Sequence, residues 1–170
     1  MEFGAASRLP LITLYRNRLL TQTVSISRAL AGGRQGLARG QAGLISYLNR
    51  VKYSFNPYNI NRLTMLAGTA AVQDTKYFDD CTAAIRQNRA WTVERLEGLG
   101  FTVLPSLANF IFAKSDKISG GDLYRELKKK GVLVRWFDTD RIRDYVRITI
   151  GSREQMEALT DRIEALLNAQ

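Results

Sequence analysis

Strand-like and helix-like segments alternate along this chain of 170 residues, and no segment is repeated. Residues 19–25 (LLTQTVS) alternate apolar and polar side chains with the period of two that is typical of a strand. The strands that we predict cover residues 19–25, 34–39, 101–104, 109–113, 132–137 and 145–150. The helices that we predict cover residues 41–53, 61–72, 75–99, 121–130 and 153–167. Such an alternation indicates an α/β or α+β fold.

The composition excludes several classes of protein. With 45% hydrophobic and 24% charged residues, the chain can bury a core, and no apolar run approaches the roughly 18 residues of a membrane span. The chain has no histidine, which excludes a Ser-His-Asp triad, a Cys-His pair and an HExxH metal site. The single Cys81 cannot form a disulfide within the chain, and the first residues lack the order of a signal peptide. We therefore expect a cytoplasmic protein without a metal or a membrane anchor.

The net charge of +9 is concentrated in the first part of the chain. Residues 1–73 contain nine Arg and Lys residues against one acidic residue, Glu2, whereas residues 74–170 contain sixteen against fifteen. This shift predicts two domains, 1–73 and 74–170. A basic region can bind nucleic acid through phosphates, but these cations form no run and do not alternate with aromatic residues, which disfavours that partner. The alternative is a surface whose acidic partner lies on another segment.

The turn after residues 19–25 is the first candidate for chemistry. Thr23 and Ser25 supply hydroxyl groups, Gly32 and Gly33 follow, and Arg34 supplies a guanidinium group. Such a set can hold a phosphate through hydroxyl, backbone and guanidinium donors. Ordinary turns have a similar composition, so composition alone leaves both interpretations open.

The same turn resembles the lysine motif of fold-type I, pyridoxal-phosphate-dependent aminotransferases, and most closely that of the histidinol-phosphate aminotransferase family. The family pattern is approximately T-x-S-K-[SA]-x-x-L-A-G-x-R-x-G. The residues of this chain that match it are Thr23, Ser25, Ser27, Leu30, Ala31, Gly32, Arg34 and Gly36. The resemblance continues in order through FNPYNINRL (55–63), LGFTVLPSLANFIFA (99–113), KGVLVRWF (130–137) and DYVRITIGSREQ (144–155). It covers essentially the whole chain.

The resemblance implies the C-terminal part of the aspartate aminotransferase-like fold, namely the end of the large-domain sheet (1–73) and the α+β small domain (74–170). It implies pyridoxal 5'-phosphate as cofactor, a small anionic substrate and a homodimer. Family members are longer, and their upstream part carries other cofactor contacts. Strands 19–25 and 34–39 should then lie inside a parallel sheet covered on both faces. Without their neighbours they would expose apolar faces and strand edges through which chains associate.

Ile26 occupies the position at which the family attaches the cofactor to a lysine. Isoleucine has no amine, so it can neither bond to the cofactor aldehyde nor transfer a proton. By resemblance, Thr23, Ser25 and Arg34 would hold the cofactor phosphate. Arg135 and Arg147 would hold the anionic group of the substrate, although a structural ion pair for each remains the alternative.

Three functions follow from these residues. The first is histidinol-phosphate aminotransferase (amino transfer between L-histidinol phosphate and 2-oxoglutarate, in histidine biosynthesis), truncated here and inactive alone. The second is a non-catalytic remnant or anion-binding module, and the third is a basic nucleic-acid binder. We also expect residues 74–170 to be the more stable part.

Overall fold

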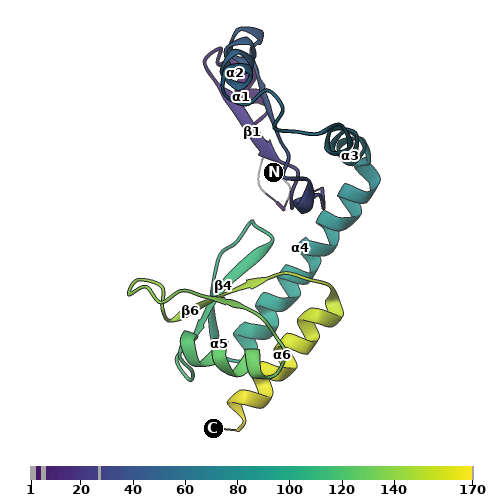
Figure 1. Cartoon of the computed structure of the whole chain (residues 1–170). Coiled ribbons are helices and arrows are strands. Elements are labelled where there is room, and N and C mark those ends of the chain that lie inside the picture. Colours follow the sequence, from purple (N-terminus) through teal and green to yellow (C-terminus); the bar gives the residue numbers. More distant parts are fainter. Residues whose placement is uncertain (1–2, 5–6, 27, 170) are drawn as a thin grey trace. The chain divides into compact units, whose positions relative to one another are not determined.

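The computed structural model describes residues 3–4, 7–26 and 28–169 (Figure 1). Ser27, one of the residues that match the family motif, lies outside the described residues. The chain divides into two compact units, residues 1–82 and residues 83–170, and the division falls within one long helix. The boundary near residue 73 stays a prediction.

The first unit is built from short elements. In chain order they are α1 (Pro10–Leu14), β1 (Leu19–Thr23), a 3-10 turn (Ala31–Gly33), β2 (Gly36–Gly40), α2 (Ala42–Phe55), α3 (Arg62–Gln73) and the start of α4 (Thr75–Gly98). The Asn61 side chain accepts a hydrogen bond from the Thr64 amide at 2.8 Å, which caps α3 at the residue where the sequence predicts its start. Helix α1 was not predicted, because five residues are too few to show a helical period.

Strands β1 and β2 form a two-stranded antiparallel sheet, with Leu19 opposite Gly40 and Thr23 opposite Gly36. The prediction that they lie inside a parallel sheet is therefore wrong for the described residues. The segment that connects β1 to β2 explains why the two strands are antiparallel. The described residues between β1 and β2 (24–26 and 28–35) contain one 3-10 turn and no crossover helix of the kind that usually joins parallel strands, and the chain reverses direction between the two strands.

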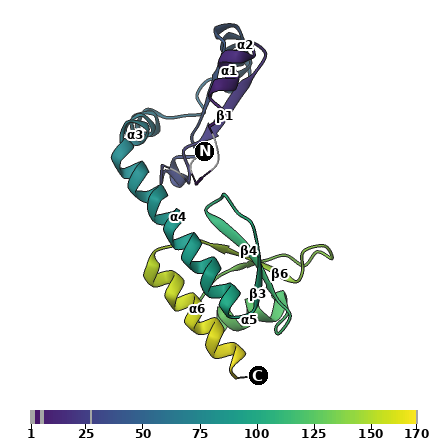
Figure 2. The same ribbon diagram turned by 180° about the vertical axis from the view of Figure 1, so that it is seen from behind.

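The second unit is an antiparallel sheet with helices on one face. Its further elements are β3 (Phe101–Leu104), β4 (Phe110–Ser115), α5 (Gly120–Lys129), β5 (Arg135–Trp136), β6 (Tyr145–Thr149) and α6 (Arg153–Leu167). The strand order is β3-β4-β6-β5, and every neighbouring pair is antiparallel. Figure 2 shows the sheet on one side of α4 and α6. The predicted helix over residues 153–167 is confirmed, with a capping box between Ser152 and Gln155 at its start.

The core of the second unit lies between this sheet and its helices. Alternate strand residues such as Ile111, Val146 and Ile148 are buried against Leu96 of α4 and Leu159 of α6. The intervening strand residues point to the opposite face, because successive side chains of a strand alternate. The helices therefore cover one face and leave the other to the polar and aromatic side chains described next.

Candidate functional site

Arg135 and Arg147 lie directly opposite each other on neighbouring strands. The register of β5 and β6 pairs Arg135 with Arg147, and residues that pair in this way project from the same face of a sheet. That face is the one away from the helices, since the flanking Val146 and Ile148 are 0% and 1% exposed on the other face. The structure thus brings together the two arginines that the family resemblance nominated from two separate motif blocks, 130–137 and 144–155.

Neither arginine forms an ion pair with a carboxylate of the described residues. The Arg147 guanidinium carbon lies 5.4 Å from the centre of the Phe110 ring, and its Nε atom is buried without a hydrogen-bond partner among these residues. The Arg135 guanidinium carbon lies 4.9 Å from the Phe137 ring centre. The structural ion pair that the sequence left open is therefore not formed here. A buried donor without a partner is costly unless a ligand satisfies it.

Aromatic rings flank the arginine pair on the same face. Phe112, which pairs with Arg147 across β4 and β6, stacks on Tyr145 with ring centres 4.9 Å apart and planes at 12°. Lys114 Nζ lies 5.8 Å from the centre of the Tyr145 ring. The register places no acidic side chain of the described strands on this face. Its chemistry, cations beside flat aromatic surfaces, suits a small anion with a planar part.

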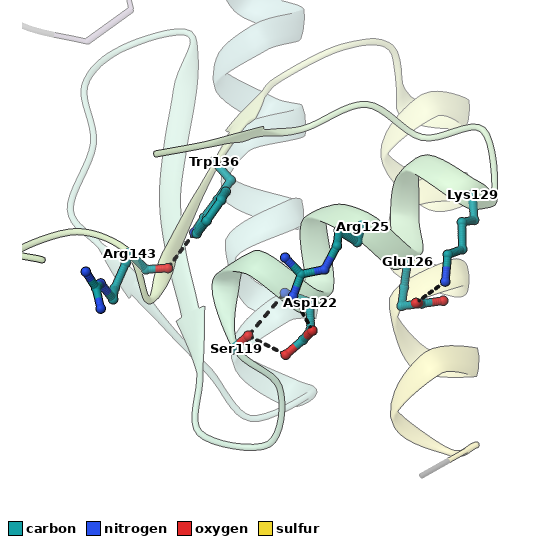
Figure 3. A network of polar contacts seen from close by, with 7 residues as sticks. All are labelled: Ser119, Asp122, Arg125, Glu126, Lys129, Trp136 and Arg143. Atoms are coloured by element: carbon teal, nitrogen blue, oxygen red, sulfur yellow. Dashed lines mark hydrogen bonds and ion pairs between the residues drawn. The ribbon is translucent and has the colours of Figure 1, made fainter. Parts of the chain in front are cut away.

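A polar network supports the short strand β5 from the covered face (Figure 3). Trp136 Nε1 donates to the Arg143 carbonyl oxygen at 2.6 Å, and its ring stacks on Tyr124 with centres 6.3 Å apart. A side chain at Gly121 would approach this indole within 3.1 Å, so glycine lets α5 pack closely on it. Because Trp136 is held in this way, the preceding Arg135 is directed to the open face.

The loop after β1 places the predicted phosphate donors on one short segment. Thr23 is exposed at the end of β1, Ser25 is half-buried in the following turn, and Arg34 is exposed with a left-handed φ of 48°. The amide of Leu30 donates to the Val24 carbonyl oxygen at 3.2 Å, which closes the loop. The side chains of Thr23, Ser25 and Arg34 make no hydrogen bond within the described part of the chain. Ile26 is 55% exposed in the same turn.

Arg28 anchors this loop, a role that the sequence did not indicate. Its Nη1 atom donates to the carbonyl oxygens of Ala71 and Asp74, each at 3.3 Å, and its guanidinium carbon lies 3.9 Å from the Phe78 ring centre. The two acceptors lie at the C-terminal end of α3, where helix carbonyl groups lack partners within the helix and attract cations. This role of Arg28 could not be predicted from the sequence, because its hydrogen-bond acceptors are more than forty positions away along the chain.

Over the described residues, no group of three or more His, Cys, Asp or Glu side chains could hold a metal ion. Among those residues, no helix has the length and hydrophobicity that are needed to cross a membrane.

The profile of the family "Aminotransferase class I and II" matches residues 1–163. The chain belongs to the aminotransferase class I and II family. Members of this family depend on pyridoxal 5'-phosphate, and the predicted fold, the C-terminal part of the aspartate aminotransferase-like fold, is confirmed by this match and by the solved structures below.

Curated relatives in this family are histidinol-phosphate aminotransferases. The protein of Clostridium botulinum (strain Kyoto / Type A2) is 46% identical over 168 residues, which cover 99% of this chain and 48% of that protein. The protein of Chromohalobacter salexigens is 43% identical over 166 residues, which cover 98% of this chain and 47% of that protein. The chain thus spans about half the length of these aminotransferases, in agreement with the predicted resemblance.

Solved aminotransferase structures share the fold. The histidinol-phosphate aminotransferase of Clostridium acetobutylicum superimposes with a TM-score of 0.84 at 24% identity, over 96% of this chain and 50% of that chain. The enzyme of Sinorhizobium meliloti, solved in complex with pyridoxal-5'-phosphate, gives a TM-score of 0.78 at 21% identity, over 91% of this chain and 42% of that chain.

Proposed function

We propose that this chain is the C-terminal portion of a histidinol-phosphate aminotransferase and that it does not transaminate alone. The reaction of the whole enzyme is amino transfer between L-histidinol phosphate and 2-oxoglutarate, in histidine biosynthesis. The observation that carries the proposal is the register of Arg135 opposite Arg147, which gives one open sheet face two guanidinium groups without described carboxylate partners. The 46% identity with the Clostridium botulinum enzyme supports it.

The role that we assign to Arg135 and Arg147 is to bind the anionic group of the substrate. A guanidinium group donates two parallel hydrogen bonds to a carboxylate or phosphate, and such charged bonds are about twice as strong as neutral ones. The buried Nε atom of Arg147 supplies a donor for which the substrate would be the partner. The ring of Phe110 lies beside the half-buried Arg147, and the ring of Phe137 lies beside the exposed Arg135.

The residues at the predicted cofactor position fit the cofactor only in part. Thr23, Ser25 and Arg34 offer two hydroxyl groups and a cation that would hold a phosphate dianion. Ile26 offers no amine for the aldehyde, so the covalent attachment does not fit. When bound, the cofactor supplies the electron sink of amino transfer. These residues would then bind and orient it, and none of them can move the substrate proton in place of the lysine.

We assign residues 1–73 to the end of the large domain and residues 74–170 to the small domain. We further propose that the complete enzyme is a cytoplasmic homodimer, as the family resemblance implies. A second candidate function is a non-catalytic module that binds small anions. The combination of Ile26 with the unpaired Arg147 favours it, since anion binding requires the arginine but not the lysine.

Titration with pyridoxal 5'-phosphate, followed by visible absorbance, tests the assignment of position 26. It is carried out on the original chain, on Ile26→Lys and on Ile26→Met as the matched control. Borohydride reduction and intact-mass measurement then detect a covalent adduct. We expect one cofactor to be trapped on Ile26→Lys and none on the other two chains. Absence of an adduct on all three would reject a working phosphate loop in this chain, and equal trapping on all three would reject position 26 as the attachment site.

A further inference from the structure

The loop between β1 and β2 is joined to two helices by the side chain of Arg28. The Nη1 atom of Arg28 donates to the carbonyl oxygens of Ala71 and Asp74, each at 3.3 Å, at the end of α3. The guanidinium carbon lies 3.9 Å from the centre of the Phe78 ring, in the first turn of α4. We propose that Arg28 is a positioning residue, which holds this loop in the conformation that binds the cofactor phosphate. The inference rests on the proposed function, which assigns the phosphate to the loop.

The described part of this loop has little regular structure of its own. It contains one short 3-10 turn, Ala31–Gly33. Two backbone hydrogen bonds close it, from the Val24 amide to the Gln35 carbonyl oxygen and from the Leu30 amide to the Val24 carbonyl oxygen, each at 3.2 Å. A segment with so few internal contacts opens easily. Contacts with neighbouring elements therefore contribute to its conformation.

Two residues of the loop have a left-handed backbone although neither is glycine. They are Ala29, with a φ of 53°, and Arg34, with a φ of 48°. The Cβ atom makes this conformation unfavourable, and it persists where the surrounding structure holds it. Arg28 directly precedes Ala29, so its contacts with α3 and α4 fix the chain at this point. Without them we expect Ala29 to adopt a more favourable conformation, which changes the path of the chain that leads to Arg34.

The surroundings of Arg28 favour a positioning role over direct binding of the phosphate. Its side chain is half-buried and lies at the C-terminal end of α3, where the helix dipole attracts cations and repels anions. A phosphate at Arg28 would compete with the helix carbonyl groups for the same guanidinium group. Arg34, by contrast, is exposed. We therefore assign the contact with the phosphate to Arg34 and the placement of the loop to Arg28.

Comparison of pyridoxal 5'-phosphate with pyridoxal, which lacks the phosphate, tests the inference. Both are titrated by visible absorbance into the 170-residue chain with Ile26→Lys, and the ratio of the two affinities measures what the loop contributes. Addition of Arg28→Met is expected to lower the affinity for pyridoxal 5'-phosphate by about tenfold and to leave that for pyridoxal unchanged. Arg28→Lys should give an intermediate affinity, because an ammonium group can still donate to the carbonyl oxygens but loses the flat contact with Phe78. Arg16→Met is the matched control, since it removes an exposed cation of the same unit.

Hydrogen exchange, followed by mass spectrometry, tests the placement of the loop without the cofactor. Arg28→Met is expected to raise the exchange of loop amides such as Leu30 and Gly33, whose hydrogen bonds lie within the loop. Residues 101–115 of the second unit should exchange as in the original chain, which reports that the variant is folded. Arg16→Met should leave both segments unchanged.

Three outcomes would overturn the inference. In the first, Arg28→Met and Arg16→Met bind pyridoxal 5'-phosphate equally well. In the second, Arg28→Met weakens the binding without faster exchange of the loop, which would assign Arg28 a direct contact with the phosphate. In the third, the loop amides exchange equally in Arg28→Met and Arg16→Met, a result that does not depend on the cofactor. Equal affinity of Ile26→Lys for pyridoxal and its phosphate would instead reject the phosphate loop, and with it that part of the proposed function.

Discussion

At the scale of single residues, Arg147 has a buried donor atom that lacks a hydrogen-bond partner and is suited to a ligand. Its Nε atom is buried without a partner among the described residues, and the neighbouring side chains on its face are aromatic or cationic. A buried polar atom without a hydrogen-bond partner destabilises a fold, and such an atom is retained where a ligand requires it. The Arg147 side chain is therefore expected to lower the stability of the fold and to raise the affinity for an anion.

Arg147→Met is therefore expected to stabilise the folded chain by about 1 kcal/mol, because an apolar side chain of similar length replaces the unpartnered guanidinium group. The same change is expected to lower the affinity for inorganic phosphate by about tenfold or more. Urea unfolding and calorimetric titration measure the two effects. Lys114→Met serves as the control for general loss of charge. A drop in stability without a change in phosphate affinity would show that Arg147 has a structural role.

At the scale of elements, the start of α5 combines a cap with an ion pair. The Asp122 amide donates to Ser119 Oγ at 3.1 Å, and the Arg125 guanidinium lies 2.6 Å from an Asp122 carboxylate oxygen. The hydrogen bond from the Ser119 hydroxyl, followed by that from Arg125, lowers the pKa of Asp122. The carboxylate also lies in the first helical turn, where a negative charge is favourable.

Because this pKa is lower in the folded state, Asp122 stabilises the fold above its ordinary pKa, and the contribution disappears as the pH falls through the folded value. Asp122→Asn should therefore lower the thermal midpoint at neutral pH. The difference between variant and original chain should shrink in acid, below the ordinary aspartate pKa of 3.8. Thermal unfolding of both chains from neutral pH to about pH 2 checks this. A difference that does not depend on pH would contradict the assignment.

The contact between α5 and the segment before β6 depends on Gly120. A side chain there would come within 2.6 Å of the Arg143 carbonyl oxygen and 2.8 Å of the Asp144 carbonyl carbon. Both are backbone atoms that cannot rotate away. Gly120→Ala is thus expected to destabilise the second unit by about 2 kcal/mol. At Gly98, at the end of α4, nothing lies within 4 Å, so Gly98→Ala should be neutral or stabilising, as chemical denaturation of both variants can show.

At the scale of the whole molecule, the two units differ in how much they bury. The second unit has one continuous core, and the first has almost none of its own among the described residues. Local opening is easier where few apolar contacts must be broken. Residues 1–73 should therefore be cleaved first in limited proteolysis, leaving a resistant fragment within residues 74–170 that mass spectrometry identifies. Persistence of residues 1–73 after loss of the rest would contradict this.

Much of the local structure could be predicted from the sequence alone. The caps at Asn61 and Ser152 and the helix end at Gly100, with a φ of 87°, depend on residues within a few positions of one another. The predicted strand over residues 132–137 is shorter in the structure, Arg135–Trp136, because only these two residues find a partner on β6. Periodicity shows that a segment suits a strand but not how far its neighbour extends.

The sequence by itself determined the family, the alternation of helices and strands, and the absence of an amine at position 26, since each is a property of residue types in order. Only the tertiary structure decided that β1 and β2 run antiparallel, that Arg135 lies opposite Arg147 and that Arg28 binds the end of α3. Each of these joins residues that are distant in the chain. Their pairing is set by strand register and by the packing of whole elements, and residue type at either end does not specify it.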